Sequence, residues 1–157
     1  MPRPRILILL LLTCLVSSAV FARGNAKTVR LDVAGGDLAK PISVTNRTLL
    51  DLSHVYAGQF LGEIVGGVDS QWPRYTIRLV FEPEIALPGA DANRNRQRTY
   101  LIHYSLNWQT GEGYVYLPGP SESGYRENIG VIIRDGHDGR WHRAQATWSS
   151  LLNPYLH

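Results

Sequence analysis

The stretch RDGHDGRWHR, residues 134–143, holds two histidines, two aspartates and three arginines, the densest site chemistry in the chain. Imidazole and carboxylate groups ligate metals and carry protons, so His137 and His142, completed by His103 from another segment, are candidate metal or catalytic residues. Their spacing matches no metal motif. Asp135-Gly136 and Asp138-Gly139 are overlapping turn signals between the strand-like runs GVIIR and RWHRA. The stretch therefore favours the tip of a hairpin, and we expect no cofactor.

Other catalytic patterns are weaker. In GPSESG, Ser121 and Ser123 do not stand in the order that a nucleophile elbow requires. Glu82 and Glu84 flank Pro83 at the end of a strand-like run, where solvated carboxylates are ordinary. The sequence has neither a phosphate loop nor a dinucleotide fingerprint. We therefore expect a protein without enzymatic activity, with a hydrolase or metal-dependent enzyme using His103, His137 and His142 as the alternative.

Two groups of side chains are candidates for ligand binding. The loop NRNRQR places Arg94, Arg96 and Arg98 at alternate positions, where guanidinium groups can hold phosphate or carboxylate; the alternative is a solvated loop. Aromatic rings form the second group, because exposed rings offer flat docking surfaces to sugars and proteins, although such rings more often belong to a core. Its members are Trp108, Tyr114 and Tyr116 around one hairpin, with Trp72 and Trp141 in or beside loops.

The sequence predicts that most of the elements that position these residues are β-strands. YTIRLVFE alternates with Tyr75, Ile77, Leu79 and Phe81 on one face, and YLIHYSLNW alternates with Tyr100, Ile102, Tyr104, Leu106 and Trp108 on one face and His103, Ser105 and Asn107 on the other. The latter leads through QTGEG into YVYL, which predicts a hairpin over 100–117. TVRLDV places Val29, Leu31 and Val33 on one face, and NIGVIIR places Ile129, Val131 and Ile133 in register.

One segment departs from this rhythm. TLLDLSHVYAGQF has apolar residues at helical spacing, Thr48 with Asp51 can form a capping box, and Gly58 limits the length, which predicts a helix over 49–57. TWSSLLNPYLH favours a further helical turn that Pro154 would stop. The predicted fold is mainly β: a single antiparallel β-sandwich or partly open barrel with one short helix packed on it, with an α+β fold as the alternative.

Residues 1–22 have the pattern of a secretory signal peptide: two arginines, an apolar run and small residues ending at Ala22. The apolar stretch, residues 6–22, is interrupted by two serines and is short for a membrane span. We expect cleavage, leaving residues 23–157 as a single periplasmic or secreted domain without a stable transmembrane anchor. Cys14 in LLTC loosely echoes a lipidation site, but Thr13 and the apolar residues that follow make a poor match.

Export also changes the charge and the cysteine count. The whole chain carries a net charge of +3, and loss of residues 1–22 leaves 14 basic against 13 acidic residues, so nucleic acid is not an expected partner. Cys14 is the only cysteine, so the mature domain would have no disulfide, which suits a bacterial envelope. We therefore expect an exported binding or accessory module for an envelope protein or an anionic or saccharide surface polymer.

The export hypothesis makes a direct prediction. Residues 1–26 fused to a reporter that is active only outside the cytoplasm should give signal, because the charged start and apolar run recruit the export machinery. N-terminal sequencing of the exported protein should begin near Arg23. Membrane-embedded protein that retains Met1 would contradict the prediction.

Overall fold

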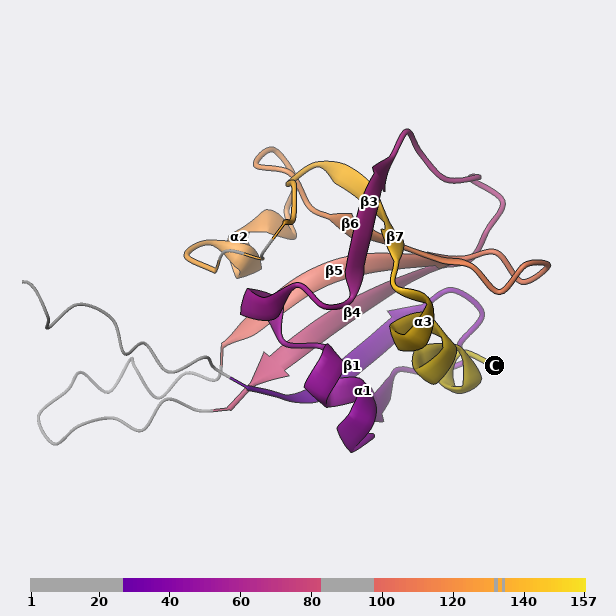
Figure 1. Ribbon diagram of the computed structural model, residues 1–157, viewed down its shortest axis with the longest axis horizontal. Coiled ribbons are helices and arrows are strands. Elements are labelled where there is room, and N and C mark those ends of the chain that lie inside the picture. Colours follow the sequence, from indigo (N-terminus) through magenta and orange to yellow (C-terminus); the bar gives the residue numbers. More distant parts are fainter. Residues whose placement is uncertain (1–26, 83–97, 132, 134) are drawn as a thin grey trace, which may run out of the picture.

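The computed structural model describes residues 27–82, 98–131, 133 and 135–157 (Figure 1). The strands are β1 (Thr28–Gly35), β2 (Ile42–Val44), β3 (Leu61–Val65), β4 (Arg74–Phe81), β5 (Thr99–Leu106), β6 (Gly113–Leu117) and β7 (Arg140–Ala144). The helices are α1 (Arg47–Leu52), α2 (Tyr125–Asn128) and α3 (Ala146–Leu152), with the 3-10 turns η1 (Val55–Ala57) and η3 (Asn153–Tyr155). Among these helices, none has the length and apolar character needed to cross a membrane.

All seven strands form one open antiparallel sheet in the order β2-β1-β4-β5-β6-β7-β3. The predicted mainly β fold with a short packed helix is confirmed, and the strands belong to one sheet rather than to the two sheets of a sandwich. Figure 1 shows a strong twist, with β3 and β7 running steeply across the direction of β1 and β4. Because β3 follows α1 in the chain but pairs with β7, the chain crosses the sheet before it returns through β4.

One face of the sheet, the inner face, packs against α1 and α3; we call the opposite face the outer face (Figure 1). The alternation predicted for β4 and β5 is confirmed, because their inner-face side chains are almost completely buried. These are Tyr75, Ile77, Leu79 and Phe81 on β4 and Tyr100, Ile102, Tyr104 and Leu106 on β5. The hairpin predicted over 100–117 is also present as β5 and β6.

Ser105 departs from the expected pattern, since the outer face on which it lies was predicted to be wet. It is fully buried, and its hydroxyl donates a hydrogen bond of 3.3 Å to the carbonyl oxygen of Pro73. The chain just before β4 therefore covers this end of the outer face. Strand alternation alone does not reveal such a cover, because it depends on a loop distant in sequence.

The start of β1 also departs from simple alternation. Val29 is 37% exposed, while Thr28 is buried, and the pairing of β1 with β4 shifts between Thr28 and Arg30. An extra residue at a bulge reverses the facing of the residues before it, so Val29 does not join Leu31 on the inner face. The Thr28 hydroxyl donates to the carbonyl oxygen of Ser53 at 2.7 Å, which explains why the polar residue takes the buried position.

The predicted helix over 49–57 forms as two shorter pieces, α1 and η1. Asn46, rather than Thr48, caps its start, because the Asn46 side-chain oxygen accepts a hydrogen bond from the Leu49 amide at 3.1 Å. Gly58 ends η1 with φ of 60°, a left-handed conformation that glycine adopts without strain. The predicted C-terminal helical turn is present as α3, which ends at Leu152, just before Pro154, and Pro154 itself lies in the 3-10 turn η3.

The strand predicted around Ile129, Val131 and Ile133 is not formed by the described residues of that segment. Helix α2 ends at Asn128, the first residue of this segment, and beyond it Ile129 is 67% exposed whereas Ile133 is buried. Asn128 explains the arrangement, since its side chain accepts from the Leu101 amide at 2.7 Å and donates to the Leu101 carbonyl at 2.8 Å. These bonds satisfy the backbone of β5 beyond the point where its described pairing with β6 ends at His103.

The environments of two neighbouring residues on β5 predict different losses of stability when each is replaced by alanine. Leu106→Ala should lower the free energy of unfolding by about 2–5 kcal/mol, because it removes inner-face apolar contacts and leaves a cavity. Ser105→Ala should cost about 1 kcal/mol, the usual value of one hydrogen bond. Urea denaturation of both variants measures the difference, and a larger loss for Ser105→Ala would reverse our assignment of the two faces.

Candidate functional site

Of the three histidines that the sequence singled out, His137 and His142 lie together, with ring centroids 6.1 Å apart, and His103 lies apart from them. His103 lies on the outer face of β5 and pairs across with Tyr116, which pairs with Trp141. His142 follows Trp141 in β7 and therefore points to the inner face, where it is fully buried. Within the described part of the chain, no three His, Cys, Asp or Glu side chains are arranged to hold a metal. The rings of His103 and His142 thus lie on opposite sides of the sheet.

His142 has a defined structural role. Its Nδ1 lies 3.2 Å from the carbonyl oxygen of Gly62, and its Nε2 accepts a hydrogen bond from the His137 amide at 3.2 Å. A neutral imidazole with its proton on Nδ1 satisfies both contacts. The predicted turn residues Asp135 and Gly139 have φ of 59° and 72°. RDGHDGRWHR thus contains a turn anchored by His142 and the strand β7, which pairs with β6 and β3.

The predicted arginine group falls largely outside the described residues. Arg94 and Arg96 lie in the undescribed range, residues 83–97. Arg98 is exposed, and its carbonyl oxygen accepts a hydrogen bond from the Phe81 amide at 2.9 Å, next to the start of β5. The suggestion that the three guanidinium groups act together on an anion therefore remains a prediction.

The predicted aromatic group is divided by the fold. Tyr114 and Tyr116 both lie on the outer face of β6, as their alternation with the buried Val115 requires. Trp108 lies in the turn between β5 and β6, is 39% exposed, and packs against the ring of His157 at 4.4 Å between centroids. It is therefore separate from the two tyrosines that share the outer face.

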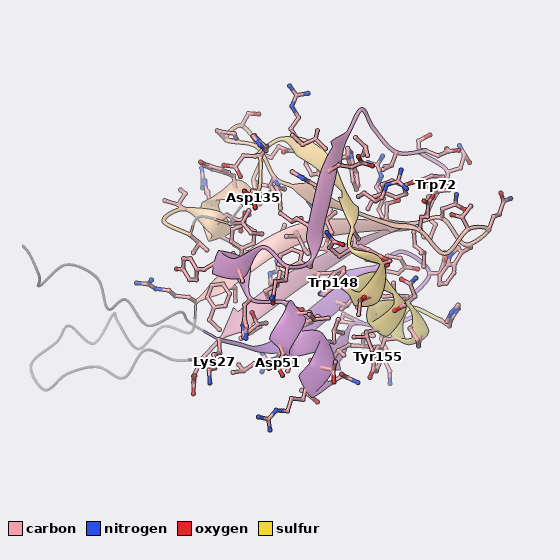
Figure 2. The ribbon with its side chains drawn as sticks, in the orientation of Figure 1. Lys27, Asp51, Trp72, Asp135, Trp148 and Tyr155 are labelled. Atoms are coloured by element: carbon pink, nitrogen blue, oxygen red, sulfur yellow. The ribbon has the colours of Figure 1, made fainter. Side chains whose placement is uncertain are left out.

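Five rings gather on the outer face, and we call them the aromatic strip: Trp72, His103, Tyr114, Tyr116 and Trp141. Tyr116 is central, with its centroid 6.2 Å from His103 and 5.1 Å from Trp141. Trp72 stacks on Tyr114 at 5.3 Å, at the end of the molecule away from Lys27 (Figure 2). All but Tyr114 are half-buried, so parts of several rings remain accessible along β6.

The register of the sheet assembles the strip from four distant segments. Cross-strand pairing aligns His103 of β5, Tyr116 of β6 and Trp141 of β7 in one row. Tyr114 lies two residues from Tyr116 on the same face, and Trp72 reaches it from the loop before β4. Strand alternation identifies the two tyrosines, whereas the contributions of Trp72 and Trp141 depend on strand order.

Arg74 supplies a positive charge to the aromatic strip. Its guanidinium lies over the Trp141 ring, 5.5 Å from the centroid, in a cation–π arrangement. The other outer-face arginines of the described strands have carboxylate partners: Arg30 with Asp32 at 2.7 Å, Arg78 with Glu127 at 3.0 Å and Arg143 with Glu112 at 2.6 Å. Among the described residues, no carboxylate lies within ion-pair distance of Arg74.

Glu122 borders the strip on the other side of Tyr116. The Tyr116 hydroxyl donates a hydrogen bond of 2.9 Å to its carboxylate. Partial burial, together with this bond and the nearby negative charge, raises the pKa of Tyr116 above its ordinary value. The phenol therefore stays protonated near neutral pH, and Glu122 fixes the orientation of its hydroxyl beside the exposed ring faces.

Comparison of the chain with protein-family models, with curated proteins and with solved structures finds no match. The function of the strip is therefore inferred from its own chemistry.

His103 provides a test of the environment of the strip. Burial lowers its pKa below 6.5, the Glu122 charge opposes this shift, and Arg74 adds to it. NMR titration of the imidazole should therefore give a value below 6.5, and Arg74→Gln should raise it. As the pH falls, the unfolded chain binds a proton at His103 before the folded chain does. The neutral imidazole therefore makes its full contribution to the free energy of unfolding above about pH 6.5, and this contribution is lost as the pH falls through the folded pKa. A value at or above 6.5 would contradict the described surroundings.

Proposed function

We propose that this protein is an exported, non-enzymatic binding module that holds an acidic saccharide polymer of the cell envelope on its aromatic strip. The main supporting observation is that partly exposed rings from four segments line up on the outer face. These segments are the loop that precedes β4 and the strands β5, β6 and β7, and Arg74 lies over one of the rings. The signal-like pattern of residues 1–22 supports an extracytoplasmic location.

The strip suits a sugar chain because its rings combine apolar faces with polar edges. A sugar ring presents C–H groups on its faces and hydroxyl groups around its rim, so an aromatic ring can cover the face while polar groups contact the rim. Tyr116 and Trp141 provide two such rings side by side, and the indole N–H and phenol hydroxyl are hydrogen-bonding groups. Their position on neighbouring strands of one sheet fixes their spacing before a ligand arrives, which reduces the entropic cost of binding.

Arg74 favours an acidic polymer over a neutral one. A guanidinium can bind a carboxylate or sulfate through two parallel hydrogen bonds, and contact with the Trp141 ring holds it beside the strip. Since its neighbours Arg30, Arg78 and Arg143 already have carboxylate partners, Arg74 is the outer-face strand arginine best placed to receive an acidic group. Arg74→Gln should therefore weaken binding to acidic chains selectively.

The proposal predicts that migration of the protein in native gels is retarded by at least one of polygalacturonate, alginate and hyaluronate. Trp141→Ala and Tyr116→Ala should each weaken the retardation about tenfold or more, as expected when a central aromatic contact is lost. Tyr155→Ala is the matched control, because Tyr155 is an exposed ring outside the aromatic strip and its hydroxyl accepts a hydrogen bond from Asn46.

Two outcomes would overturn the proposal. One is migration unaffected by all three acidic polymers. The other is equal retardation of the Trp141→Ala and Tyr155→Ala variants. Envelope extract treated with protease should still compete for binding; loss of competition would point to a protein partner on the strip instead.

A further inference from the structure

A pocket of about 980 Å³ lies beside the aromatic strip, at the end of the sheet where α3 leaves β7. It is bounded by the β3 residues Gly62 and Glu63, the turn between β5 and β6, and the exposed side of α3 and η3. Its volume is within the range of pockets that enclose small organic ligands. The strip does not account for this pocket, which has its own set of polar groups.

One wall is built by a bulge in β3. The pairing of β3 with β7 shifts between Leu61 and Ile64, so Gly62 and Glu63 lie outside the regular ladder. A Cβ atom on Gly62 would lie 2.9 Å from the carbonyl oxygen of Arg143, so only glycine fits there without a shift. The buried His142 ring fixes the Gly62 carbonyl from the inner side. The fold therefore holds Glu63 at the pocket wall.

Arg143 links this wall to the next. Its Nη1 contacts the Glu112 carboxylate at 2.6 Å, and its Nε lies 3.3 Å from the Glu63 carboxylate. The wall thus carries two carboxylates for one guanidinium, an excess of negative charge that disfavours an anionic ligand. Planar carboxylate and guanidinium groups side by side offer both acceptors and donors, which suits an uncharged ligand rich in hydroxyl groups.

The opposite wall is held in place from the core. Asn153 accepts a hydrogen bond from the Tyr104 hydroxyl at 2.7 Å and donates one to the Gly111 carbonyl at 3.2 Å. Tyr104 itself is fully buried, so this wall is tied to the inner face of β5. Ser150 and Ala146 stand on the exposed side of α3 and line the pocket with small side chains.

The pocket and the aromatic strip are joined by a direct contact. The Tyr114 hydroxyl donates a hydrogen bond of 3.2 Å to Glu112, the same carboxylate that contacts Arg143. We infer that the pocket binds a neutral oligosaccharide of about two or three sugar units, a ligand distinct from the charged units held on the strip. This inference goes beyond the function proposed for the strip, because it rests on the lining of the pocket alone.

The test uses three neutral trisaccharides, maltotriose, cellotriose and triacetylchitotriose, in NMR titrations of the purified full chain. At least one should perturb the amide signals of residues 110–113 and 146–150 at up to about 10 mM, a range that detects a Kd near 1 mM. Ser150→Trp should weaken that binding about tenfold or more by filling the pocket. Thr147→Trp is the matched control, since Thr147 is exposed on the same helix but does not line the pocket.

The outcomes separate this inference from the function proposed for the strip. Absence of perturbation by all three sugars, or equal binding by Ser150→Trp and Thr147→Trp, would overturn the inference. Ala146→Tyr blocks the same pocket and replaces Ser150→Trp if that variant does not give a folded spectrum. Trisaccharide binding that survives in Trp141→Ala is expected. If Trp141→Ala also leaves binding of the acidic polymers unchanged, the strip proposal fails while the pocket assignment stands.

Discussion

Burial of Trp148 is the interaction on which the rest of the structure depends. An open sheet leaves one apolar face to be covered, and Trp148 of α3 helps to cover it by packing on Tyr104 at 5.6 Å and on Phe60 at 5.5 Å between ring centroids. Its indole N–H donates to the Ser53 hydroxyl at 2.8 Å, and that hydroxyl donates to the Leu49 carbonyl at 2.6 Å. A large apolar ring is thereby buried with its one polar group satisfied, and α1, α3 and β5 are joined.

With the inner face covered by helices, the outer face is available for polar and aromatic groups held on a rigid sheet. At one end, Asn128 attaches α2 to the backbone of β5, and Glu127 of the same helix pairs with Arg78. At the other end, the loop carrying Trp72 covers Ser105. The aromatic strip begins at this second cover, which supplies Trp72, and continues along β6. All of its rings except Tyr114 are half-buried, which holds them in position while leaving surface for a ligand.

How well each feature of the fold can be predicted depends on how far apart in the sequence the residues that determine it lie. The facing of Tyr75 to Phe81 and of Tyr100 to Leu106 follows from alternation within one strand, and sequence is sufficient for it. The bulge that exposes Val29 depends on pairing with β4, and the loss of the strand expected around Ile129 depends on contacts between Asn128 and Leu101. Such pairings form only in the assembled sheet, so they cannot be predicted from the pattern of residues along one segment of the sequence.

The same distinction applies to the site, where the pleat of the sheet separates residues that are neighbours in sequence. Tyr114 and Tyr116 are identifiable because both the hairpin and its alternation are local. Trp141 joins them, and the adjacent His142 does not, because successive side chains of β7 point to opposite faces. The aromatic residue of the WH pair thus reaches the outer surface beside Tyr116, while the imidazole enters the core and binds backbone groups. In RDGHDGRWHR, the alternation of the strand rather than the density of reactive groups determines which side chain can meet a ligand on the outer face.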